Sequence, residues 1–442
     1  MHDEGPTARQ MRLGAFIHHV GHHVAAWRLP DVPAFGAMDL EHYASLTRKA
    51  EAAKFDMVFI GDSLATWESG PEADSRMAGH AFLEPATLVA ALATHSTHIG
   101  LAATITATYN EPYNVARRLA SLDHISGGRV AWNLVTSSNP AEGQNFNRDS
   151  HVPHDDRYAR AQEFIDVVKR LWDSFDDDAF VLDKAGGRFF DPAKWRATHH
   201  KGPHFQVRGP LTVARPVQGH PVIAQAGQSG PGMALASRVG EAIFTLQQTK
   251  ESARKFRDEI RAMAVGHGRD ADDILVMPGI VPVTGRTEAE ARETFDRLQA
   301  LVLPEVGLAL LAQMLGADLS GYDLDGPVPD DLPPNEGFKS RRAALLEQSR
   351  RDNLTLRQLY EANAPARGHR VIVGSGAQIA DMMQDWFENG AADGFMLLPT
   401  HLPGGLDDFI ARVLPELRQR GLFRNEYEGR TLRENLGLKR PG

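Results

Sequence analysis

The chain has 442 residues, 42% of them hydrophobic and 24% charged, with a formal net charge of −9. This composition is ordinary for a soluble globular protein, and no basic face favours nucleic-acid binding. Because the chain contains no cysteine, disulfides, thiolate metal sites and cysteine nucleophiles are excluded. The polar N-terminus lacks the apolar core of a signal peptide, and no run approaches the ~18 apolar residues of a membrane span. We therefore expect no membrane insertion and a cytoplasmic location.

Short strand-like runs alternate with longer helical patterns along the chain. Strands are predicted over residues 12–19, 55–60, 99–104, 129–136, 221–226, 242–246, 274–283 and 395–398. Helices are predicted from a cap at Asp39 to residue 53, over 85–95, 112–125 and 156–175, after Gly230, and over 250–265, 287–301, 378–389 and 406–420. Alternation of this kind predicts a parallel sheet.

Two stretches interrupt this alternation. Residues 176–215 and 302–370 show no clear period, and we interpret both as insertions. Eight strands, most of them followed by a helix, favour an α/β fold of the (β/α)8 TIM-barrel type. Residues 1–442 would then form a single domain that carries the two insertions. An open α/β sheet with extra helices is the alternative.

In a TIM barrel the functional site lies at the carboxyl ends of the strands. The fifth predicted strand leads into Gln225-Ala226-Gly227-Gln228-Ser229-Gly230 and then into a helix. Gly227 would let the backbone approach a ligand closely, and the helix start beside Ser229 offers free N–H groups and a partial positive charge. We therefore predict a phosphate site at this loop. A plain turn with a helix cap is the alternative.

His154 and Tyr158 are four residues apart in the sequence. Placed in the first turn of a helix, they would share one face. Both side chains can donate hydrogen bonds, so they could hold a phosphate from the side opposite the Gly227 loop. A surface histidine beside a half-buried tyrosine is the alternative.

Three further polar residues stand at strand ends. Asp62 follows the second strand in a Gly-Asp-Ser turn, where its carboxylate could accept from a ligand hydroxyl or ring N–H, or could act as an ordinary turn residue or helix cap. Thr104 ends the third strand and could donate to a polar ring edge, or could pack as a β-branched strand residue. Asn133, in the fourth strand, could likewise bind a polar ring edge or simply pack within the strand.

A histidine cluster follows the first strand, where His18-His19 is followed by His22-His23. A metal site needs three or four ligands and supporting contacts around them, and no convincing histidine or lysine at the other strand ends completes such a set. We therefore predict no metal. His18 and His19 are candidates for catalytic proton handling on the substrate side, with loop packing as the alternative.

Several stretches together resemble a known family, and the similarity extends over residues 12–422. They include Tyr109-Asn110-Glu111-Pro112-Tyr113, the run from Ser121 to Arg129, Trp132-Asn133-Leu134-Val135-Thr136-Ser137, His154-Asp155-Asp156-Arg157-Tyr158 and Gln225-Ala226-Gly227. With these motifs the chain resembles the nitrilotriacetate monooxygenase type of flavin-dependent monooxygenases in the bacterial-luciferase-like superfamily.

The resemblance implies that reduced FMN serves as a co-substrate with O2, giving a flavin C4a-hydroperoxide that oxidises a small organic substrate. It implies FMN contacts at positions matching Asp62, Thr104, His154, Tyr158 and Ser229, with the phosphate near Tyr158 and Ser229. It also implies a homodimer or homotetramer and a separate NAD(P)H:FMN reductase. The chain shows no convincing Gly-x-Gly-x-x-Gly strand–helix unit of its own, which agrees with reduction elsewhere.

Two other functions remain open on the same barrel. One is an F420-dependent oxidoreductase, since the superfamily includes dehydrogenases that use this deazaflavin as a hydride carrier. The other is a non-catalytic flavin-binding protein. Oxygen consumption separates the monooxygenase from the F420-dependent enzyme.

Overall fold

Eight parallel strands close into a barrel in a computed structural model, which describes residues 9–66, 68–329, 332–333 and 339–442. The barrel strands, in their order around it, are β1 (Arg12–Ile17), β2 (Met57–Ile60), β3 (Gly100–Thr106), β4 (Val130–Val135), β7 (Val222–Gln225), β8 (Ala242–Thr245), β9 (Leu275–Gly285) and β11 (Gly394–Leu397). The barrel is closed because β9 pairs with β8 and with β11, and β11 pairs in turn with β1. The predicted TIM barrel is confirmed.

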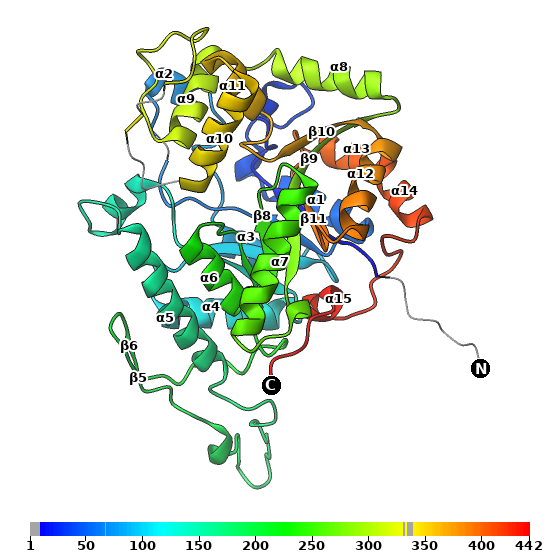
Figure 1. Cartoon of the computed structure of the whole chain (residues 1–442). Helices are drawn as coiled ribbons and strands as arrows, with labels where there is room; N and C mark the ends of the chain where they lie inside the picture. The colour runs from blue at the N-terminus through cyan, green and yellow to red at the C-terminus, as the bar shows by residue number, and fades with distance from the viewer. Residues whose placement is uncertain (1–8, 67, 330–331, 334–338) are drawn as a thin grey trace.

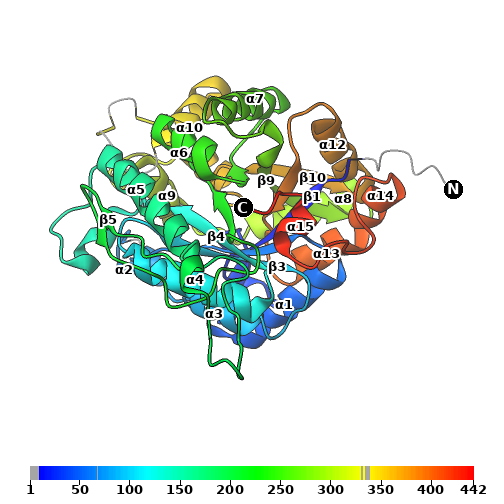
Figure 2. The ribbon, with the colours of Figure 1, turned by 90° about the horizontal axis from the view of Figure 1, so that it is seen from below.

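Helices surround the barrel, as the view along it in Figure 2 shows. They are α1 (Leu40–Ala52), α3 (Pro85–Leu92), α4 (Pro112–Ser126), α5 (His154–Trp172), α6 (Gly230–Val239), α7 (Lys250–Gly266), α8 (Glu288–Gln299), α12 (Gly376–Glu388), α13 (Gly404–Arg412) and α14 (Leu414–Gln419). Their ends follow local chemistry. Asp39 caps α1 by accepting from the Glu41 N–H, and Gly127 ends α4 in the left-handed conformation. The predicted helix 406–420 is wrong in one respect, because α13 and α14 are separate helices that meet at Val413.

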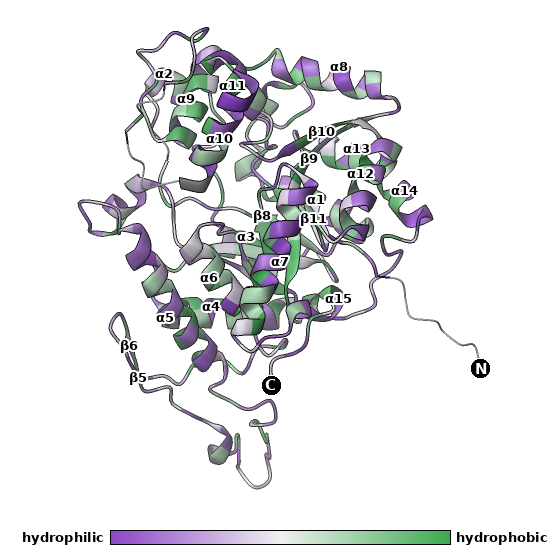
Figure 3. Cartoon of the chain, in the orientation of Figure 1, coloured by the Kyte–Doolittle hydropathy of each residue, from purple (hydrophilic) through white to green (hydrophobic). Residues whose placement is uncertain are grey.

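The hydrophobic core has two layers. Residues such as Met57, Phe59 and Met277 fill the inside of the barrel, while a larger cluster that includes Trp132 and Phe164 lies between the strands and the helices. Figure 3 shows hydrophilic residues on the outer helices α5, α7 and α8. No single helix of the described residues is long and apolar enough to cross a membrane; only α8 with α9 (Pro304–Leu315), a pair bent by 91°, passes that test together.

The first predicted insertion, residues 176–215, lies between α5 and β7 and extends away from the barrel at the bottom of Figure 1. Its regular structure is small: the antiparallel pair β5 (His200–Lys201) and β6 (Gln206–Val207), and one short 3-10 helix. The expectation of an irregular segment agrees with this structure.

The second predicted insertion, residues 302–370, is not irregular as expected. It contains α9, α10 (Lys339–Asp352) and α11 (Leu356–Asn363), which share a hydrophobic cluster that includes Leu311 and Leu359. These helices lie together with α2 (Pro71–Asp74) at the top of Figure 1. A ninth strand, β10 (Arg370–Ser375), which the sequence did not predict, pairs parallel with the far end of β9.

Candidate functional site

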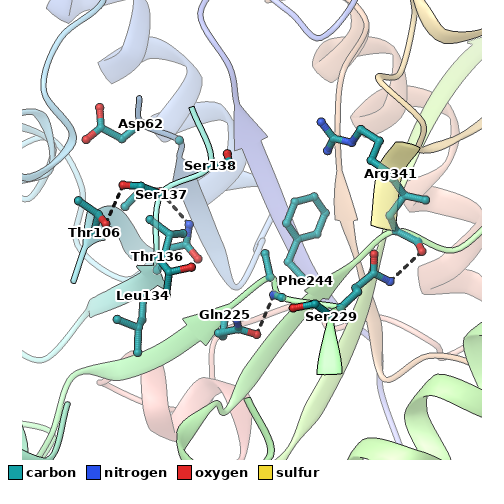
Figure 4. Close-up of a pocket in the computed structure, with 18 of the residues that line it drawn as sticks. Asp62, Thr106, Leu134, Thr136, Ser137, Ser138, Gln225, Ser229, Phe244 and Arg341 are labelled. Carbon is teal, nitrogen blue, oxygen red and sulfur yellow. Dashed lines mark hydrogen bonds between the residues drawn. The ribbon is translucent and has the colours of Figure 1, made fainter. Parts of the chain in front are cut away.

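A cavity of about 540 Å³ opens where the barrel strands end. Its walls come from β2, β3, β4, β7 and β8 with the loops that follow them, from the start of α5 and from α10. Figure 4 shows the polar side chains of these strand ends arranged around it. This position matches the carboxyl-end rule for TIM barrels.

All seven residues predicted to contact a cofactor line this one cavity. They are Asp62, Thr104, Asn133, His154, Tyr158, Gly227 and Ser229. They come from five separate regions of the chain, and the fold brings them together.

The loop between β7 and α6 forms one wall of the cavity. The Ser229 hydroxyl accepts from the Gly232 N–H at 3.2 Å, which caps α6, and lies 3.4 Å from His154 Nε2. His154 begins α5, and its ring centroid lies 4.9 Å from that of Tyr158. The two residues therefore share one face as predicted, and they meet the Ser229 loop.

Gly227 occupies a position with no room for a side chain. A Cβ there would lie 2.5 Å from Gln225 Nε2, 2.9 Å from Gly232 Cα and 3.2 Å from the Tyr158 hydroxyl. The bare backbone of this loop thus reaches close to the Tyr158 hydroxyl, and a ligand group between them would meet the N-terminus of α6.

Thr104 and Asn133 form a buried hydrogen-bonded pair across β3 and β4. The Thr104 hydroxyl donates to the Ile60 carbonyl at 2.7 Å and accepts from the Asn133 amide at 2.9 Å. This fixes the Asn133 side chain, whose Oδ1 is buried with no hydrogen-bond partner among the described residues. Buried acceptors are normally paired, so Asn133 offers an open acceptor to a ligand N–H.

Asp62 is a half-buried carboxyl at the end of β2. Burial, together with the nearby negative charges of Glu84 and Glu142, raises the pKa of Asp62 to about 7. Asp62 therefore exchanges a proton near neutral pH, which matches what general acid–base chemistry requires.

His18 and His19 are not among the residues that line the cavity. They lie behind its Phe16 wall: the ring centroid of His18 is 5.8 Å from that of Phe16, and His19 stacks on Phe82 at 4.8 Å. Burial lowers the pKa of His19 to about 3 and that of His18 well below its usual value. Within the described ranges, no three His, Asp or Glu side chains are arranged to hold a metal ion.

Among the cavity residues that sequence reasoning missed are Glu142, Phe244, Arg341 and His369. Phe244 lies inside the predicted strand 242–246, whereas the carboxyl-end rule points to polar residues at the ends of strands. Glu142 lies in a 3-10 helix after β4, and Arg341 and His369 lie in the segment interpreted as an irregular insertion.

Comparisons with known proteins match the whole barrel. A family model described as luciferase-like monooxygenase matches residues 11–393. The chain is 48% identical over 441 residues to nitrilotriacetate monooxygenase component A of Aminobacter aminovorans, covering 98% of this chain and 97% of that protein. It is 47% identical over 436 residues to N-acetyl-S-(2-succino)cysteine monooxygenase of Bacillus subtilis (strain 168), covering 98% of each.

A solved structure gives the same result for the fold. The crystal structure of riboflavin lyase with modified FMN and riboflavin is 34% identical, with a TM-score of 0.88, and the match covers 98% of this chain and 96% of that chain.

Proposed function

The chain belongs to the luciferase-like monooxygenase family and is a flavin-dependent monooxygenase, and we propose that it uses reduced FMN to insert one oxygen atom from O2 into a small organic substrate. The observation that carries this proposal is the meeting of seven predicted cofactor residues around one cavity. The proposal is also supported by the similarity to nitrilotriacetate monooxygenase component A.

The residues present fit FMN. Ser229, Tyr158, His154 and the bare backbone at Gly227 would hold the phosphate, because they offer hydrogen-bond donors at the positive end of α6. The unpaired Oδ1 of Asn133 would accept from a ring N–H, and Thr104 would hold Asn133 in the required orientation.

When bound, reduced FMN supplies the oxygen activation, and the chain's part is to orient, shield and move protons. Phe16, Phe59 and Phe244 give one part of the cavity aromatic walls that exclude water. Asp62 would give and take a proton at its carboxyl near neutral pH. His18 and His19 stay proposals for proton handling on the substrate side, acting from behind Phe16.

The partners follow from the same family. We propose that a separate NAD(P)H:FMN reductase supplies the reduced flavin, that the protein works in the cytoplasm, and that it assembles as a homodimer or homotetramer. The similarity to nitrilotriacetate monooxygenase component A, which is named as one component of an enzyme, supports the separate reductase.

Anaerobic titration of the full chain with oxidised and reduced FMN tests the proposal. We expect tight binding of reduced FMN, and after oxygen is admitted we expect the bound flavin to release hydrogen peroxide more slowly than free reduced FMN. Failure to bind either form would overturn the proposal. Binding of F420 in their place, with no oxygen consumption, would favour the hydride-transfer enzyme.

A further inference from the structure

One end of the cavity carries basic side chains. Arg341, from α10, and His369, just before β10, both line it. Figure 4 shows Arg341 on the side of the cavity away from Asp62 and Thr106, with its guanidinium directed inward. His369 stacks on Phe244, with ring centroids 5.0 Å apart and planes 11° from parallel.

More nitrogen atoms lie directly behind this end. The His22 ring centroid is 4.7 Å from that of Phe16 and 5.0 Å from that of His18. His18 Nε2, both ring nitrogens of His22 and Arg367 Nε are buried and have no hydrogen-bond partner in the described part of the chain. Buried polar groups are normally satisfied, so this cluster has more nitrogen groups than acceptors.

The charge at this end is positive and comes from the two arginines. Arg367 lies close enough to Arg341, His18 and His22 to lower the pKa of each. Burial lowers the pKa of Arg367 itself to about 10, so it stays charged at neutral pH. No carboxylate of the described residues forms an ion pair with Arg367, in contrast to the buried arginines Arg257, Arg424 and Arg433, each of which has a carboxylate partner. The histidines stay neutral, because burial lowers their pKa.

Burying a charge without an opposite charge is costly, and a ligand carboxylate near Arg367 would relieve that cost. Guanidinium groups match the geometry of carboxylates and bind them by paired, charge-assisted hydrogen bonds. The aromatic rings of Phe16 and Phe244 beside the arginines would pack against the apolar part of the same molecule. The site therefore suits a small organic anion with a carboxylate and an apolar body.

We infer that the substrate of this enzyme carries a carboxylate group, which Arg341 contacts directly and Arg367 stabilises from behind, at the cavity end lined by Phe244 and His369. This inference rests on the proposed function, because it assigns the remaining part of the same cavity to the substrate.

Equilibrium binding to the full chain tests the inference, measured calorimetrically with and without saturating FMN. The probes are benzoate, phenylacetate, succinate and tricarballylate, each beside its neutral primary amide. We expect at least one carboxylate to bind roughly tenfold more tightly than its amide. Arg341→Gln should abolish that preference, and Arg367→Gln should reduce it several-fold with amide binding unchanged, a selectivity that a merely structural role would not alter.

Arg351→Gln is the matched control, because Arg351 lies on the exposed face of the same helix and pairs with Asp352. Its binding of all probes should equal that of the wild type. If Arg367→Gln does not fold, Arg367→Lys keeps the charge and should retain most of the carboxylate preference.

The inference is overturned if no carboxylate binds better than its amide, or if the preference survives Arg341→Gln. It is also overturned if Arg341→Gln weakens FMN binding and leaves the probes unaffected. If the wild-type chain fails to bind FMN but still prefers carboxylates to their amides, the proposed function alone is overturned.

Discussion

Asp62 and Glu142 are the acidic side chains among the described residues that line the cavity. Burial of the Asp62 carboxyl raises its pKa from 3.8 to about 7, so the folded chain binds a proton that the unfolded chain has released. Between these two values, stability must fall as the pH rises. The effect belongs to one side chain and can be measured by removing its charge.

Asp62→Asn keeps the shape of the side chain and is neutral at every pH. We expect the free energy of unfolding of this variant, relative to the wild type, to increase between pH 4 and pH 7 and then to level off. Since one pKa unit corresponds to ~1.4 kcal/mol, the increase should be ~2–4 kcal/mol. Urea denaturation of the flavin-free chain at several pH values measures it.

Asp270→Asn is the control, because this exposed carboxyl has a lowered pKa, owing to its bond from the Asp272 N–H and to Lys439. Its relative stability should fall slightly as the pH rises through the acid range, the opposite sign. A pH-independent difference for Asp62→Asn would contradict the raised pKa.

Removal of the Tyr158 hydroxyl tests one hydrogen-bond donor of the proposed phosphate site. Its hydroxyl lies beside the Gly227 backbone, so Tyr158→Phe removes one donor and leaves the ring packed against His154. We expect FMN to bind more weakly by ~1 kcal/mol or more, the contribution of a charge-assisted hydrogen bond. Tyr322→Phe, at an exposed tyrosine, should leave the affinity unchanged. Equal affinities in both variants would remove Tyr158 from the site.

Strand ends made most of the cavity predictable from the sequence. Asp62, Thr104 and Asn133 could be found because each lies in or directly after a compact apolar strand whose end is visible in the pattern. Arg341 and His369 could not be found in this way. Arg341 reaches the cavity because α10 packs against the strand ends, and His369 because the segment before β10 does. Long-range packing of this kind leaves no local period in the sequence.

At the scale of elements, the turn between β7 and α6 depends on Gly227. We expect Gly227→Ala to lower stability by ~1–3 kcal/mol, the usual cost of adding a methyl group where there is no room. It should weaken FMN binding as well, because the loop backbone must move away from Gly232 and Tyr158. Thermal unfolding and an FMN titration measure both effects.

Gly230→Ala is a close control, since a Cβ at this helix start meets nothing within 4 Å. The variant should be as stable as the wild type and should bind FMN equally well. If Gly227→Ala behaves in the same way, the close approach of the backbone has no role in the site.

The helices of residues 302–370 show why elements can be missed. α9 is apolar on nearly every face, so it has no amphipathic period, and α10 has none because charged residues surround it. α11 begins with a capping box at Thr355 and Gln358, a local signal that was available in the sequence. Among the described strands β10 pairs with β9, and most of its residues are half-buried. Its apolar run, Val371-Ile372-Val373, is only three residues long and directly follows the stretch interpreted as an insertion, so it was not predicted as a strand.

At the scale of the whole molecule, Asp393 holds the closure of the barrel together at the end opposite the cavity. Its carboxylate accepts from the Val276 N–H of β9 at 2.9 Å and from Arg257 of α7 at 3.0 Å and 2.9 Å. Its carbonyl accepts from the Arg12 N–H of β1. One residue thus joins the first strand, the last strand and β9, where the sheet meets itself.

Asp393→Asn should therefore destabilise the whole chain. Removing one partner of a buried ion pair leaves Arg257 without its counter-charge and removes one of the two carboxylates that pair with Arg261, which costs ~3–5 kcal/mol. The arginines hold the pKa of Asp393 below its usual value of 3.8, so this stabilisation is present above that value and is lost as the pH falls below it. Chemical denaturation at neutral and acid pH measures both effects.

Asp272→Asn is the control that distinguishes the effect of the buried carboxylate at the barrel closure from that of a surface ion pair. Asp272 pairs with the same Arg261 at 3.1 Å, but its side chain is 87% exposed. Its loss should cost less than ~1 kcal/mol, since exposed ion pairs contribute little. FMN affinity of the folded protein should be unchanged in both variants, because the cavity lies at the other end of the strands and neither residue lines it. A loss of FMN binding in Asp393→Asn at temperatures well below its melting transition would mean that the closure end and the cavity end of the barrel are coupled.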